Sequence, residues 1–126
     1  MDGKKDGTMR AFIMAVVVMA GSVAMADDIA DAHLLAVAGR NSYWNCLARE
    51  YARDGNRNLS EQDFTSLVAS ACASERQNFR VTLVDYLSMQ FPRSDAGDPM
   101  TTANNAIALA QKEIVTAFIG HKPASK

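Results

Sequence analysis

The chain has 126 residues, with 13 Lys and Arg against 14 Asp and Glu and a formal net charge of −1. A partner such as nucleic acid or an anionic membrane surface needs a basic face that displaces counterions. The balanced charge gives no basis for such a face, so we expect neither partner.

The first 26 residues have the parts of a secretory signal peptide. A positively charged start that ends at Arg10 is followed by the uncharged run 11–26, and Ala24 and Ala26 fit the small-x-small cleavage pattern. The run is shorter than the roughly 20 apolar residues of a membrane-crossing helix, so we expect no membrane span after cleavage. We predict cleavage after Ala26 and export, to a bacterial periplasm or the medium, of a single domain at residues 27–126.

The two cysteines, Cys46 and Cys72, both lie in the exported part. In an oxidising compartment their default state is a disulfide. A domain of about 100 residues has one modest core, so such a link helps it. Closing this loop would stabilise the fold by about 3 kcal/mol, because it restricts the unfolded chain.

The first predicted helix begins at Asp28, a good N-cap residue. Its apolar residues recur at about 100° per residue from Ile29 to Leu47. Gly39 lies within this stripe and has two interpretations. It either lets a second helix approach closely or breaks the helix, because glycine costs about 1 kcal/mol in a helix interior.

Two more helices are predicted further along the chain. The second has Ser60 as its N-cap, in a variant of the capping box, and ends before Phe91, which a proline follows. The third has Asp98 as its cap and proline at its first position, shows apolar residues at three-four spacing, and stops at Gly120.

These segments predict an all-α antiparallel bundle of three long helices, or four if the first breaks near Gly39, with one interhelical disulfide. The cysteine positions support a hairpin of the first two helices. Facing residues of antiparallel helices have a nearly constant sum, which places the centre of the turn at about residue 59, close to the predicted turn 54–60.

Trp44 is the most informative single residue. By helical phase it points away from the Cys46 stripe, so it either contacts the third helix or is exposed. Only 7% of the residues are aromatic, and an exposed Trp44 beside Val37 and Tyr51 would indicate a partner surface.

The turn after the first helix resembles an EF-hand calcium loop at its two ends. Asp54, Asn56 and Asn58 have the spacing of the first oxygen ligands, and Asp63 stands where the loop's bidentate glutamate would be. The middle is two residues short and lacks the glycine of the sharp bend. The alternative is a plain helix-turn-helix, in which the same residues form the turn and the next cap.

Glu50 and Glu75 follow the two cysteines by about one helical turn. A pair of carboxylates could act as an acid and a base. The interpretation that we favour is structural, with Glu75 in a buried ion pair or hydrogen-bond network formed with Arg40, Arg76 and Tyr43.

His33 and His121 lie near the two ends of the exported part, an arrangement similar to that of exported haem-binding four-helix bundles. There is no Cys-x-x-Cys-His motif for covalent attachment. We predict no catalytic residue, resident cofactor or enzyme activity. The leading hypothesis is a non-catalytic module, structural or binding another exported protein or itself; the alternative is a bundle that carries calcium or haem.

Overall fold

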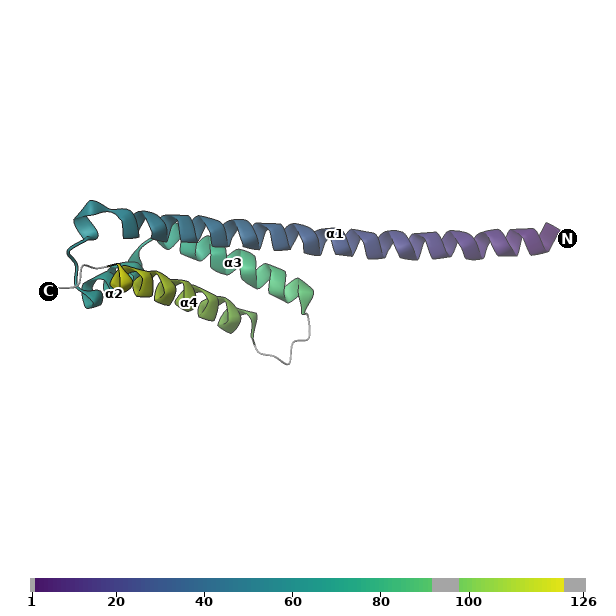
Figure 1. Ribbon diagram of the computed structural model, residues 1–126. Helices are drawn as coiled ribbons and strands as arrows, with labels where there is room; N and C mark the ends of the chain where they lie inside the picture. The colour runs from purple at the N-terminus through teal and green to yellow at the C-terminus, as the bar shows by residue number, and fades with distance from the viewer. Residues whose placement is uncertain (1, 92–97, 122–126) are drawn as a thin grey trace. The chain divides into compact units, whose positions relative to one another are not determined.

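The computed structural model describes the backbone of residues 2–91 and 98–121 and the side chains of residues 26–91 and 98–121. The described elements, in chain order, are α1 (Asp2–Ala52), the 3₁₀ helix η1 (Asp54–Asn56), α2 (Glu61–Ser70), α3 (Ala73–Gln90) and α4 (Pro99–Gly120) (Figure 1). No described residue is in a strand, which confirms the all-α prediction.

The chain divides into two units, Met1–Asp31 and Ala32–Lys126. The described part of the first unit consists only of the N-terminal stretch of α1. The second unit is a helical bundle that contains the rest of α1 and all other helices. Among the described residues, no helix combines the length and the apolar character needed to cross a bilayer.

The predicted caps begin α2 and α4. The Ser60 hydroxyl accepts a hydrogen bond of 3.0 Å from the backbone N–H of Asp63, and Asp98 accepts one of 3.3 Å from the backbone N–H of Met100. Pro99 fills the first position of α4, where its missing N–H costs nothing. Short-range capping chemistry therefore sets these two helix starts.

Gly39 does not break α1, which continues past it to Ala52. Its other interpretation applies, because α3 lies very close to it. A Cβ built on Gly39 would lie 2.8 Å from Thr82 Oγ1 and 3.1 Å from Phe79 Cα. The glycine therefore allows two helix backbones to approach where any side chain would collide.

The bundle has a fourth helix for a different reason: the predicted second helix is two helices. The chain breaks at Ala71 and Cys72, where Ala71 is extended and Cys72 is left-handed, with φ 60° and ψ 41°. Cys72 is linked to Cys46 with a Cα–Cα distance of 6.0 Å. The Arg76 guanidinium donates to the carbonyls of Ala69 and Ala71 at 2.7 and 3.3 Å and so satisfies the end of α2.

The core lies where the four helices meet. Its buried residues are Tyr43, Leu47, Phe64, Val68, Phe79, Ile107, Ala110, Ile114 and Phe118. The rings of Phe64 and Phe118 stack with centroids 3.8 Å apart. The Gln111 amide donates a hydrogen bond of 3.0 Å to the Tyr43 hydroxyl, which gives this buried phenol a partner.

Candidate functional site

The described residues form an open groove of about 310 Å³ between α1, α3 and α4. Phe79, which is 5% exposed, belongs to its floor. Trp44 lines the wall on α1, and Leu109 lines the wall on α4. Its lining is mainly apolar and aromatic with a few charged groups, as is usual for ligand and partner sites.

Helical spacing brings the groove residues together. On α1, Val37, Arg40 and Trp44 follow each other at intervals of three and four and therefore lie on one face. On α4, Leu109 and Glu113 are four residues apart and share a face in the same way. The two walls thus have a similar composition, an apolar residue followed one turn later by a charged residue.

Trp44 is both in contact with other helices and partly exposed, the two alternatives that its sequence position left open. It packs against the core cluster and also lines the groove, where it is partly exposed. Val37, 38% exposed, lines the same groove. Tyr51 does not: it packs on the core further along α1, with its ring edge-on to His121 at a centroid distance of 6.0 Å. The structure therefore joins two of the three residues predicted for the interaction surface.

Sequence reasoning missed the wall of the groove that α4 provides. Leu109 is 56% exposed although it is a large apolar residue. Its signal was present in the sequence, since Leu109 lies outside the three-four seam that buries Ile107 and Ala110. An exposed apolar residue becomes informative when it joins others in one patch, as Leu109 joins Val37 and Trp44 along the groove.

The groove holds one cation and one anion on opposite walls. Arg40 lies on α1 and Glu113 on α4, and both are exposed. Within the described part of the chain, neither has an ion pair or hydrogen bond, in contrast to Glu50, which is 2.9 Å from Arg53. Both charges are therefore available to an external partner.

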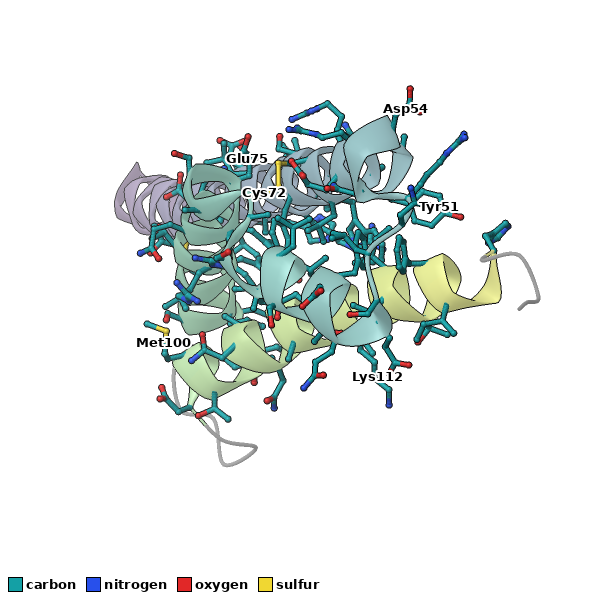
Figure 2. All side chains as sticks on the ribbon, turned by 90° about the vertical axis from the view of Figure 1, so that its left-hand side faces the viewer. Tyr51, Asp54, Cys72, Glu75, Met100 and Lys112 are labelled. Atoms are coloured by element: carbon teal, nitrogen blue, oxygen red, sulfur yellow. A yellow bond between two sulfur atoms is a disulfide. The ribbon has the colours of Figure 1, made fainter. Side chains whose placement is uncertain are left out.

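The predicted network around Glu75 is wrong. Glu75 Oε2 lies 3.9 Å from the guanidinium of Arg49, not beside Arg40. Arg76 turns back to the end of α2, and the Tyr43 hydroxyl binds Gln111 on α4. Figure 2 shows Glu75 next to Cys72 on the α1 side of the bundle. Glu75 and Arg76 are neighbours on α3, but one faces α1 and the other turns back to the end of α2.

The turn residues considered for calcium have other contacts. Asp54 lies in η1, highly exposed, at 3.9 Å from the guanidinium three residues along. The Asn56 amide donates to the carbonyl of Glu50 at 2.8 Å and to its carboxylate at 3.3 Å. Asn58 is exposed, and Asp63 belongs to the cap of α2. Among the described residues, no three or more His, Cys, Asp or Glu are placed to hold a metal ion.

The two histidines are at different levels of the bundle. His33 lies against Tyr86 with ring centroids 5.0 Å apart, whereas His121 lies against Tyr51. Positions 33 and 51 of one helix are about 27 Å apart at about 1.5 Å per residue. The two imidazoles therefore cannot bind the same haem iron.

Comparisons of the chain with models of protein families, with curated proteins and with solved structures find no match.

Proposed function

We propose that the chain is exported, loses residues 1–26, and acts as a non-catalytic module that binds a protein through the groove beside Trp44. The leader-like charge and cleavage pattern supports export, as does the pairing of both cysteines in a disulfide. The boundary between the two units, after Asp31, supports the removal of the leader, because the bundle that begins at Ala32 lies entirely beyond the cleavage site.

The observation that carries the binding proposal is the position of Trp44. It is the single tryptophan of the chain, it is partly exposed, and it stands in the wall of an apolar groove. Tryptophan is strongly enriched at the centres of protein interfaces, because burying its large ring against a partner contributes much binding free energy. Val37 and Leu109, both exposed, extend the apolar surface around it.

A protein partner fits this groove better than a buried small ligand. The groove is open along α1 and α4, and its apolar residues stand on the rims as well as on the floor. Apolar centres with charged residues at the edge are typical of protein interfaces. A helix or another extended surface can cover both rims at once.

Photocrosslinking in the host cell tests this proposal. A photoreactive residue at Val37 is expected to give a discrete covalent adduct, either with a second copy or with another exported protein. The matched control is Val81 on α3, which is 47% exposed and outside the groove. Equal adducts from both positions, or none from Val37, would contradict the proposal.

The fluorescence of Trp44 is a second readout. Covering the indole moves its emission to shorter wavelength, because water leaves its surroundings. We expect this shift when the purified, unreduced protein is mixed with the partner identified by crosslinking. The variant Val37→Asp should reduce the shift, and Val81→Asp should leave it unchanged.

A further inference from the structure

We infer that the groove binds a second copy of the same chain, in a two-fold symmetric dimer held by reciprocal Arg40–Glu113 ion pairs. This inference rests on the proposed function, for which it names the partner. The argument depends on the charges of the groove, the direction of its helices and the apolar residues on its rims.

The charges of the groove are complementary to themselves. Its α1 wall carries Arg40 and its α4 wall carries Glu113. Neither side chain forms an ion pair with another described residue. In a two-fold dimer the same patch meets itself, so a contact from one residue to another is made twice. A groove with one cation on one wall and one anion on the other can therefore neutralise both charges with a second copy alone.

The direction of the helices allows this pairing. Tyr43 of α1 contacts Gln111 of α4, and Tyr51 of α1 contacts His121 of α4, so residue numbers rise together along the two helices. The helices are thus parallel, and in Figure 1 α4 runs in the same direction as the last part of α1. A two-fold axis along their common direction places α1 of one copy opposite α4 of the other.

The levels of the two charges differ by less than two helical turns. From the Tyr43–Gln111 contact, Arg40 is level with about residue 108 of α4, so Glu113 lies about five residues, or roughly 7 Å, further along. An arginine side chain is long enough to cover most of such an offset. The symmetric arrangement can therefore bring each guanidinium to a carboxylate of the other copy.

The rims supply the apolar contacts of such a dimer. Val37 precedes Arg40 by three residues and Leu109 precedes Glu113 by four, with exposures of 38% and 56%. Leu34, 65% exposed, lies one further turn along α1. Under the same rotation the α1 rim with Leu34 and Val37 of one copy faces the α4 rim with Leu109 of the other. The interface therefore combines apolar contacts with ion pairs, as many specific interfaces do.

Charge reversal tests the inference with the purified, unreduced exported protein. The dissociation constant of the dimer is measured by analytical ultracentrifugation for Arg40→Glu and for Glu113→Arg. Each variant should dissociate at least about tenfold more readily, because each places two like-charged pairs in a symmetric dimer. The controls Arg57→Glu and Asp85→Arg make the same changes in charge at exposed positions outside the groove and should dimerise as the unchanged protein does.

The decisive step mixes the two variants. An Arg40→Glu chain has two acidic residues in the groove, and a Glu113→Arg chain has two basic ones. In a heterodimer of the two, both pairs unite opposite charges, so mixing should restore association to at least the level of the unchanged protein. An Arg40–Glu113 pair within one chain would give no such restoration.

Three outcomes would overturn the inference: an unchanged protein that stays monomeric at millimolar concentration, reversals without effect, or a mixture that stays monomeric. Crosslinking at Val37 then separates the two proposals. An adduct with another exported protein would retain the proposed function and reject the second copy as partner. Absence of any adduct would reject both.

Discussion

The two faces of α1 are built in opposite ways. One face meets α3, where the two backbones approach closely at Gly39 and a disulfide links Cys46 to Cys72 at the start of α3. The other face, at Val37 and Trp44, borders an open groove. The closed face stabilises the bundle, and the open face leaves apolar surface for a partner. One helix can thus separate stability from binding, because substitutions on each face should change only one of them.

Removing the disulfide should have the largest effect on the closed face. The double variant Cys46→Ala/Cys72→Ala is expected to lose about 3 kcal/mol of unfolding free energy, because the unfolded chain regains the freedom of the closed loop. Urea unfolding monitored by circular dichroism measures it. The unreduced protein should show no titratable thiol. Unchanged stability of the double variant would mean that the disulfide is dispensable.

A side chain at Gly39, where α1 and α3 approach closely, should cause the next largest loss of stability. Gly39→Val places a side chain where even a Cβ would lie 3.1 Å from Phe79 Cα, and backbone cannot move aside easily. We expect a loss of about 2 kcal/mol, as for other overpacked cores. Gly120→Val is the control, because nothing lies within 4 Å of a Cβ there. A stabilised Gly39→Val variant would show that α1 and α3 are further apart than described.

The left-handed backbone of Cys72 predicts a smaller difference in stability between two variants that lack the disulfide. Its φ of 60° is left-handed, which costs L-residues other than glycine about 1–2 kcal/mol. Glycine adopts this conformation freely but adds entropy to the unfolded chain. Cys46→Ala/Cys72→Gly should therefore be more stable than Cys46→Ala/Cys72→Ala by about 0.5–1 kcal/mol in urea unfolding. Equal or reversed stabilities would mean that the break at residue 72 disappears with the disulfide.

The break at Cys72 also explains which parts of the fold the sequence predicts. The helix starts at Ser60 and Asp98 depend on residues within three positions, so local patterns suffice for them. The end of α2 has no glycine or proline, and its apolar residues stay in helical phase across the break from Val68 to Phe79. Local patterns therefore give no sign of the break. It lies at the cysteine that the disulfide links to α1, a contact distant in the sequence.

The candidate site was predictable on one wall only. Helical phase placed Val37 and Trp44 on the second face of α1. The opposite wall depends on which side of α4 turns toward α1, and this follows from tertiary packing, as in the stacking of Phe64 on Phe118. For the same reason Tyr51, two helical turns beyond Trp44 on the same stripe, contacts the end of α4 and not the groove.

The smallest expected effect on stability has the clearest consequence for binding. Val37→Asp changes a side chain that is 38% exposed on the rim of the groove, so the unfolding free energy should fall by no more than about 0.5 kcal/mol. Association through the groove should nevertheless be lost, because a partner would have to bury an unpaired carboxylate. Val81→Asp, more exposed and outside the groove, should retain both stability and association. Urea unfolding and ultracentrifugation measure the two quantities on the same samples.

Two results would contradict this prediction. If Val37→Asp unfolds the bundle, Val37 belongs to the stabilising face, and the distinction between the two faces of α1 fails. If Val37→Asp leaves association intact, the groove is not the binding surface.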